Sequence, residues 1–166
     1  MDRRYQRLFI IGIIIVVIDQ STKLYIAKTL PLHQSIEVIK GYFDIIHIRN
    51  RGAAFGLFSG MGGTFVTIFF IIISLIAISV ILFSFTQIER DNYLAHGGLF
   101  LILGGAVGNL IDRIWHGEVV DFLDLYWHDY HWPAFNIADA FITVGVGILI
   151  WDMVIASRRG GCQERS

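Results

Sequence analysis

One uninterrupted apolar segment constrains this chain more than any other feature of its sequence. Residues 63–85, GTFVTIFFIIISLIAISVILFSF, contain no charged side chain. A helix of about 20 apolar residues is long enough to span the hydrocarbon core of a bilayer. The rest of the chain agrees, since 55% of its 166 residues are hydrophobic and only 16% are charged. The sequence therefore predicts an integral membrane protein that forms one domain over residues 1–166.

Three further segments reach or approach spanning length. Residues 94–113 are mostly apolar and contain a few polar side chains. Residues 137–155 are apolar but are interrupted by Asp139 and Asp152. Residues 8–27 begin with an apolar run of 11 residues before a polar stretch starts. Together with residues 63–85, these segments predict a membrane all-α fold, a four-transmembrane-helix bundle.

The first segment also permits a second interpretation. Three arginines precede it, Arg3, Arg4 and Arg7, and a short apolar run after basic residues is typical of a secretory signal peptide. A signal peptide ends at a cleavage site of small residues, whereas this run is followed by DQSTK at 19–23. A retained first helix is the favoured interpretation.

Four helices place both termini on the same side of the membrane, and the basic residues indicate which side. The side of the termini carries seven Lys or Arg residues in its flanks and loop: Arg3, Arg4, Arg7, Arg90, Arg158, Arg159 and Arg165. The other side carries five: Lys28, Lys40, Arg49, Arg51 and Arg113. Because cytoplasmic flanks are enriched in Lys and Arg, we predict cytoplasmic termini. Residues 28–62 and 112–136 then share the extracytoplasmic face.

The two extracytoplasmic segments differ in their patterns. Residues 46–50, IHIRN, alternate apolar with polar side chains, and Gly41 and Gly52 punctuate the region. Alternation of this kind is typical of a half-buried strand, so we expect a small β element at about residues 36–58. Residues 112–136 are rich in Trp and Tyr, which favour the headgroup level. We expect this second segment to be a loop along the membrane surface.

Polar residues inside the predicted helices are few and are placed in pairs. An ionisable side chain within a membrane span is costly, so it usually faces a partner or a cavity. Asp19 and Lys23 stand four residues apart on one helix face; they either neutralise each other or shape a site at the outer end of the helix. Asn109 and Arg113 share a face in the same way, and Arg113 either extends to the interface or holds a phosphate.

Two acidic residues are the candidates for chemistry. Asp121 lies in VVDFLD and Asp139 in FNIADA, where Asn136 is placed to cap the last helix. Two carboxylates that come close share one proton, so that one can act as a general base on water and the other as a general acid. Sequence spacing does not show that the two meet, and the alternative is two interfacial acids beside aromatic anchors. Asp124 would share the face of Asp121 if its segment were helical.

Other classes of protein explain these features less completely. A transporter or channel would place its charges along a pathway at mid-membrane, whereas these acids cluster at one face. A metalloenzyme would use His116, His128 and His131, but no HExxH motif is present. A membrane anchor leaves the two aspartates without a role, and the GxGD motif of presenilin-type proteases is absent. The net charge of -1 argues against a nucleic-acid partner.

Five motifs occur in a specific order along the chain. They are DQSTK (19–23), NRGAAFGLF (50–58), GGAVGNLIDR (104–113), VVDFLD (119–124) and FNIADA (135–140). This ordered set closely resembles bacterial lipoprotein signal peptidase, also called signal peptidase II or prolipoprotein signal peptidase. The resemblance extends from about residue 8 to residue 155.

The resemblance implies a role for each matching residue. The catalytic aspartates of the family fall on Asp121 and Asp139, and Asp124 lies outside the pair. The residues implied to bind substrate or to support the site are Asp19, Lys23, Asn50, Gly52, Asn109, Arg113 and Asn136. The implied fold is a four-helix transmembrane bundle with a small extracytoplasmic β-sheet cradle and a surface helix.

The resemblance also implies an activity and a location. The family consists of intramembrane aspartyl endopeptidases that need no cofactor and no metal. They remove the signal peptide from diacylglyceryl-modified prolipoproteins by cleaving before the lipidated cysteine. The implied partners are therefore these prolipoproteins, membrane lipids and inhibitors of the globomycin type. The implied location is the bacterial cytoplasmic (inner) membrane, with a site near the extracytoplasmic face.

A two-aspartate mechanism predicts that activity does not depend on a metal ion. Cleavage of a lipidated precursor should continue at an unchanged rate when EDTA is added, because the carboxylates themselves activate water. The rate of precursor cleavage with and without chelator measures this. Loss of cleavage with EDTA and its return with zinc would instead support the histidine interpretation.

Overall fold

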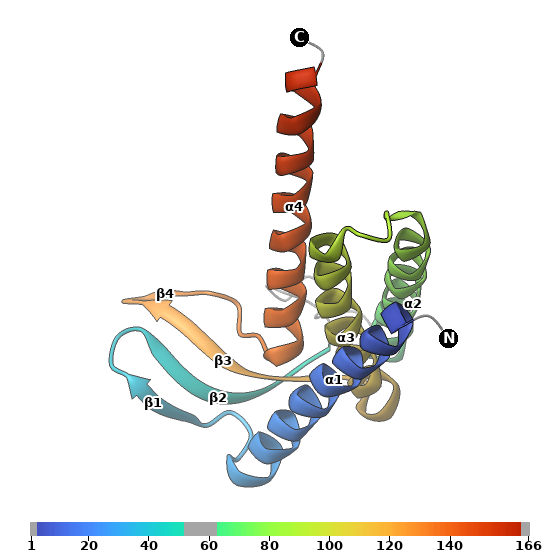
Figure 1. Ribbon diagram of the computed structural model, residues 1–166. Coiled ribbons are helices and arrows are strands. Elements are labelled where there is room, and N and C mark those ends of the chain that lie inside the picture. The colour runs from blue at the N-terminus through green and yellow to red at the C-terminus, as the bar shows by residue number, and fades with distance from the viewer. Residues whose placement is uncertain (1–2, 52–62, 164–166) are drawn as a thin grey trace.

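The computed structural model describes residues 3–51 and 63–163. Within these ranges the chain forms four long helices and a small sheet (Figure 1). The helices are α1 (Arg3–Thr29), α2 (Gly63–Gln87), α3 (Tyr93–His116) and α4 (Ile137–Gln163). The strands are β1 (Ser35–Ile39), β2 (Phe43–Asn50), β3 (Val119–Trp127) and β4 (Tyr130–His131). The sheet is antiparallel, with strand order β1-β2-β3-β4.

All four described helices are long and apolar enough to cross a membrane. The predicted four-helix architecture with a small antiparallel sheet is therefore confirmed. The helices extend beyond the ranges expected from hydropathy, because polar residues at their ends continue the helical hydrogen bonding. The surface helix implied by the resemblance is not among the helices of the described ranges, and residues 52–58 of the expected β element lie outside those ranges.

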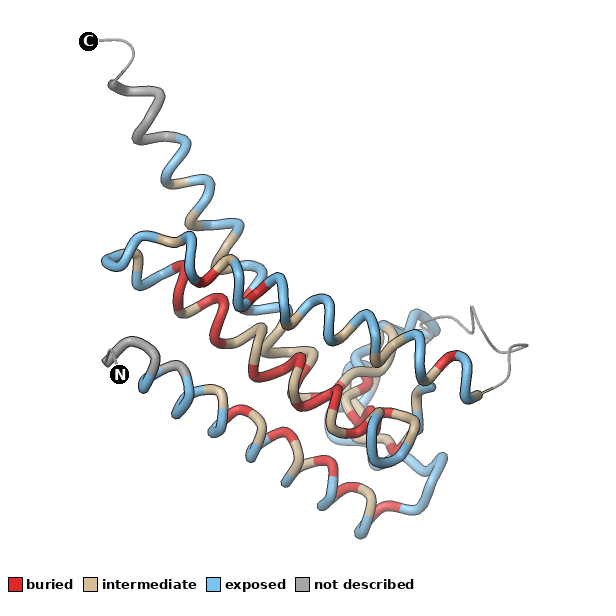
Figure 2. Tube along the Cα trace, turned by 90° about the vertical axis from the view of Figure 1, so that its right-hand side faces the viewer, coloured by how far each residue is buried: buried red, intermediate tan, exposed pale blue. Residues whose placement is uncertain are grey.

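Helix α3 lies at the centre of the bundle and packs against α1, α2 and α4. Figure 2 shows buried positions along most of α3, whereas α1 is buried only at regular intervals along one face. Glycines allow this close packing, since a Cβ on Gly104 would lie 2.8 Å from a side-chain carbon of Ile15 on α1. A Cβ on Gly105 would collide with the carbonyl oxygen of Ala138 on α4.

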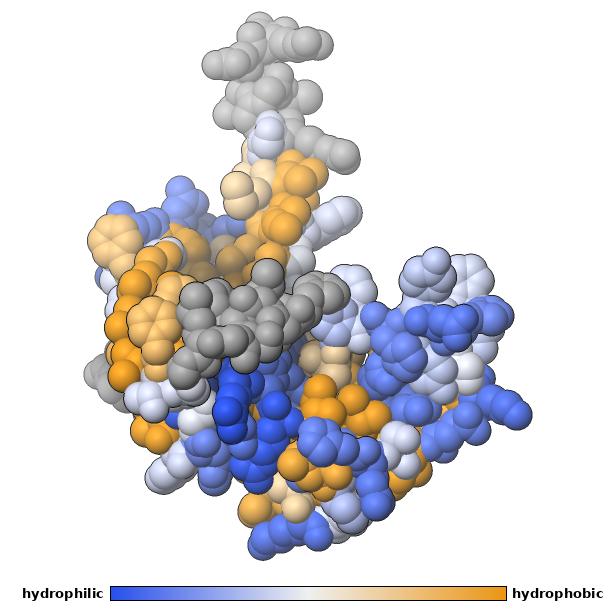
Figure 3. Space-filling model, turned by 180° about the vertical axis from the view of Figure 1, so that it is seen from behind, coloured by the Kyte–Doolittle hydropathy of each residue, from blue (hydrophilic) through white to orange (hydrophobic). Residues whose placement is uncertain are grey.

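The outer faces of the helices are apolar. Only Val66, Ile81 and Phe85 are buried on α2, and many large apolar side chains of α2 and α4 point outward, including Phe65, Ile68, Ile72, Val144, Ile150 and Trp151. Figure 3 shows apolar side chains over the helices, while hydrophilic side chains gather towards the end that carries the sheet. Such a surface suits a hydrocarbon environment.

The sheet lies at the end of the bundle opposite the two chain termini (Figures 1 and 2). Its third strand corrects the expectation that residues 112–136 form a surface loop. Gly117, with φ of 73°, ends α3 in the left-handed conformation, and β3 begins two residues later. The strand pairs with β2, so that Ile48 lies opposite Asp121. Residues 119–122 are all buried, and this removes the alternation by which a strand is recognised in a sequence.

Substitution at Gly105 tests the close packing of α3 against α4. We expect Gly105→Ala to destabilise the detergent-solubilised protein by roughly 1–3 kcal/mol, because the added methyl group forces the helices apart. Gly97→Ala on the same helix is the matched control, since a Cβ there meets nothing within 4 Å. Thermal unfolding followed by tryptophan fluorescence measures both. Equal melting temperatures for the two variants would contradict the packing described above.

Candidate active site

The first turn of α4 holds Asp139 by two reciprocal hydrogen bonds with Asn136. The Asn136 side-chain oxygen accepts a hydrogen bond from the backbone N–H of Asp139 at 3.1 Å, and the Asp139 carboxylate accepts one from the backbone N–H of Asn136 at 3.2 Å. This is a capping box, which satisfies two otherwise free N–H groups at a helix start. The sequence NIAD thus fixes the position of the Asp139 carboxylate locally.

The side chain of Asn136 also reaches the second carboxylate. Its Nδ2 donates to Asp121 Oδ1 at 2.7 Å, and Asn50 Nδ2 donates to Asp121 Oδ2 at 2.9 Å. Asn136 and Asp121 are almost completely buried, at 0% and 2% exposure, whereas Asp139 is half-buried. A single buried residue therefore contacts both aspartates, and the structure brings the two predicted candidates together.

Burial raises the pKa of the Asp121 carboxyl to about 6, and the hydrogen bond from Asn50 opposes this increase. The nearby charge of Asp139 raises the pKa further. A carboxyl group in such surroundings remains protonated at a pH at which an exposed one is ionised.

Asn109 of α3 joins the pair to a buried cation. Its Nδ2 donates to Asp139 Oδ1 at 2.8 Å, and its Oδ1 accepts from Lys23 Nζ at 2.9 Å. The same oxygen accepts a longer bond, of 3.2 Å, from Asn136 Nδ2. The amide oxygen thus accepts two hydrogen bonds and the amide nitrogen donates one, so the orientation of the side chain is fixed.

Lys23 lies between two carboxylates deep in the bundle. Its ammonium is 2.8 Å from Asp19 Oδ2 and 2.9 Å from Asp112 Oδ2. Asp19 Oδ1 in turn accepts from the backbone N–H of Ala138, at 3.0 Å, in the first turn of α4. Asp19 and Lys23 thus form the neutralising pair that one interpretation predicted, and Asp19 also contacts the first turn of α4.

Two polar residues of this cluster were missing from the sequence-based set. Asp112 accepts a hydrogen bond from Gln20 Nε2 at 2.9 Å, and its other oxygen faces the backbone N–H of Val120 at 3.4 Å, next to Asp121. Gln20 also donates to the carbonyl oxygen of Gly108 at 3.1 Å. The available signal was their spacing, since Gln20 follows Asp19 directly and Asp112 stands three residues after Asn109.

The guanidinium of Arg113 faces the two aspartates from α3. Its charge is close enough to interact with both Asp139 and Asp121, and its Cζ lies 5.4 Å from the ring centroid of Phe70. Its NH1 donates to the carbonyl oxygen of Asn109 at 3.4 Å, and its buried Nε has no hydrogen-bond partner among the described residues. Arg113 therefore offers donors to a molecule that enters the site.

Asp124 lies apart from the pair. It is three residues from Asp121 in a strand rather than a helix, so the two side chains point to opposite faces of the sheet. Its carboxylate instead contacts His131 Nδ1 at 2.9 Å.

Within the described residues, no group of three or more His, Cys, Asp or Glu side chains is arranged to hold a metal ion. Gly52, predicted as a site residue, lies outside the described ranges.

Comparisons with known proteins identify relatives over almost the whole chain. The family described as Signal peptidase (SPase) II matches residues 11–155. The lipoprotein signal peptidase of Geobacter sulfurreducens is 50% identical over 86% of this chain and 88% of its own length. That of Geobacter metallireducens is 46% identical over 96% of this chain and 97% of its own length.

Solved structures agree with these sequence comparisons. One bacterial membrane enzyme superposes with a TM-score of 0.80 at 36% identity, covering 92% of this chain and 90% of its own. A second reaches 0.77 at 37% identity, covering 89% and 92%. Fold and site together thus define a multi-pass membrane enzyme with two adjoining carboxylates at one end of its bundle. The chain belongs to the signal peptidase II family, as the resemblance of its motifs indicated.

The contact between Asp124 and His131 predicts a mild effect of substitution. Asp124→Asn should retain cleavage of a lipidated precursor within several-fold of the wild-type rate, since the residue faces away from the pair. It should lower thermal stability slightly, because His131 is mostly exposed and its contact is screened. His131→Asn is the matched variant and should behave in the same way. Loss of cleavage in Asp124→Asn alone would place Asp124 in the active site.

Proposed function

We propose that this protein is an intramembrane aspartyl endopeptidase that removes the signal peptide from diacylglyceryl-modified prolipoproteins, cleaving before the lipidated cysteine. The observation that carries the proposal is the contact of Asn136 with both Asp121 and Asp139. The relatives at 50% and 46% identity are lipoprotein signal peptidases, and they support the same substrate class.

The proposed reaction uses the two aspartates as an acid and a base. One carboxylate takes a proton from water while the water oxygen bonds to the carbonyl carbon of the scissile peptide. The other protonates the carbonyl oxygen, and the C–N bond breaks when the amine nitrogen receives a proton. Asn50 donates a hydrogen bond to Asp121 and is proposed to support the pair. Arg113, whose Nε has no hydrogen-bond partner among the described residues, is proposed to bind the substrate backbone.

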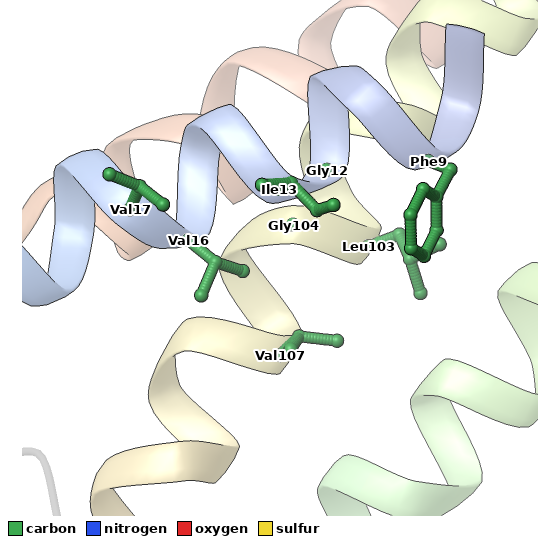
Figure 4. Close-up of a pocket in the computed structure, with 8 residues that line it drawn as sticks. All are labelled: Phe9, Gly12, Ile13, Val16, Val17, Leu103, Gly104 and Val107. Atoms are coloured by element: carbon green, nitrogen blue, oxygen red, sulfur yellow. The ribbon is translucent and has the colours of Figure 1, made fainter. Parts of the chain in front are cut away.

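The lipid part of the substrate is proposed to lie against apolar helix faces. Figure 4 shows one such surface, a groove of about 410 Å³ between α1 and α3. It is lined by Phe9, Gly12, Ile13, Val16, Val17, Leu103, Gly104 and Val107. Val17 is two residues before Asp19, and Val107 directly precedes Gly108, whose carbonyl oxygen binds Gln20 in the buried polar cluster. Contacts with acyl chains here would supply binding energy away from the scissile bond.

The proposed orientation places the sheet and the site at the extracytoplasmic face of the bacterial inner membrane, with both termini in the cytoplasm. The count of basic residues favours this orientation. It is also supported by the position of the sheet at the end of the bundle opposite the termini. We further propose that inhibitors of the globomycin type bind at this site, as the family resemblance implies.

Asn substitutions of the pair test the proposed function. Asp121→Asn and Asp139→Asn should each lower the cleavage rate of a lipidated precursor by at least roughly 10²- to 10⁴-fold, because each removes one proton-transfer group. Cleavage is measured in membranes from the shift in size between precursor and product. Asp44→Asn is a suitable control, since Asp44 accepts a hydrogen bond from Tyr126 in the sheet.

Two further measurements make the result decisive. Each variant should be present in the membrane at the wild-type level and should melt cooperatively, so that loss of activity is not loss of protein. Full cleavage by either Asp variant would exclude the two-carboxylate mechanism.

A further inference from the structure

The two aspartates of the pair have different surroundings. Asp121 is on a strand, is 2% exposed, and receives hydrogen bonds from the neutral amides of Asn50 and Asn136. Asp139 is half-buried at the start of a 27-residue helix. Burial disfavours the charged form of a carboxyl group, whereas the positive end of a helix dipole favours it. The positions of the two residues therefore favour the neutral form of Asp121 and the charged form of Asp139.

The hydrogen bonds that Asp139 accepts further favour its charged form. One carboxylate oxygen accepts from the backbone N–H of Asn136 at 3.2 Å, and the other accepts from Asn109 Nδ2 at 2.8 Å. The Asn109 oxygen is itself bound to the ammonium of Lys23 at 2.9 Å. A cation on the oxygen of an amide draws electron density from its nitrogen and makes its N–H a stronger donor. The charge of Lys23 thus reaches Asp139 through one side chain.

The other charged groups around the pair do not reverse this order. Asp19 and Asp112 partly offset the charge of Lys23, but their remaining oxygens bind the Ala138 N–H and Gln20. The ammonium contacts the side-chain oxygen of Asn109, whereas the guanidinium of Arg113 contacts its backbone carbonyl oxygen. Arg113 interacts with both aspartates and more strongly with Asp139. The charge of Lys23 also acts on Asp121, where burial outweighs it. Helix α2 carries no charged side chain, and β2 reaches the pair through the neutral Asn50.

We propose that the resting pair keeps its proton on Asp121 and leaves Asp139 ionised, and that Lys23 sets this order through Asn109. The proposal rests on the proposed function. Asp139 then takes the proton from water while Asp121 donates its proton to the carbonyl oxygen. When the intermediate collapses, Asp139 protonates the departing nitrogen and Asp121 recovers a proton from one hydroxyl group. The pair thereby returns to its starting state, and Lys23 is a positioning residue.

The increase in the pKa of Asp121 to about 6, caused by burial, agrees with this order. The half-buried position of Asp139 also agrees, because the base must contact the attacking water.

The pH profile of kcat/KM distinguishes the ionisation of Asp139 from that of Asp121. In this scheme the acid limb reports ionisation of Asp139, and the alkaline limb reports loss of the proton from Asp121. Lys23→Gln removes the charge that favours ionised Asp139, so it should move the acid limb to higher pH by about one pH unit, with a smaller effect on the alkaline limb. Asn50→Ala removes a donor to ionised Asp121, so it should move the alkaline limb to higher pH.

Two controls accompany these variants. Lys28→Gln makes the same change on an exposed turn of α1 and should move neither limb. Lys23→Arg keeps the charge and should restore the acid limb towards its wild-type position. An alkaline limb moved chiefly by Lys23→Gln, or an acid limb moved by Asn50→Ala, would assign the proton to Asp139 and overturn the proposal. Unchanged limbs in both variants would also overturn it.

Infrared spectroscopy tests the same assignment without changing Lys23, whose loss leaves Asp19 and Asp112 buried without their cation. At a pH below 6, the C=O stretching band of a buried protonated carboxyl group should disappear in Asp121→Asn and persist in Asp139→Asn. The reverse pattern would overturn the proposal. If both Asp variants cleave normally, the proposed function itself fails. If both are inactive but the band follows Asp139, only the proton assignment fails.

Discussion

Carboxylates within an apolar bundle must receive hydrogen bonds from neighbouring segments, because water does not solvate them there. This requirement connects the elements of the structure to one another. Asp19 binds the first turn of α4, Lys23 binds α3 through Asn109 and Asp112, and Asn136 binds β3 through Asp121. The polar contacts that satisfy these groups are the same contacts that align the two aspartates.

The close packing of α3 makes this network possible. Where Gly108 stands, a Cβ would lie 2.5 Å from Asp19 Oδ2, so any larger residue would push α1 away from the polar cluster. The apolar outer faces of the helices then separate the cluster from water along most of the bundle. Asp139 is half-buried in the first turn of α4, whereas Asp121 is enclosed on β3. An enclosed acid beside a more accessible one is the asymmetry that general acid–base chemistry requires.

Much of the fold and of the site was predictable from local patterns. Apolar segments of spanning length predicted the helices, and the Asp19–Lys23 spacing predicted their ion pair. The strand at Val119–Trp127 was not predictable in this way. Its residues 119–122 are buried on both faces and pair with β2, which is about 70 residues earlier in the chain. Asp112 and Gln20 were overlooked for a similar reason, since their partners lie on other elements.

The sequence by itself determined the membrane setting, the helices and the identity of the candidate acids, because hydropathy, helical spacing and ordered motifs are properties of short segments. The tertiary structure decided that Asn136 contacts both Asp121 and Asp139, that Asp124 faces His131 instead, and that Lys23 is connected to Asp139 through Asn109. These relations join residues on β3, α1, α3 and α4. They depend on how glycine-mediated helix packing and strand pairing place those elements, and no local pattern in the sequence encodes such distances.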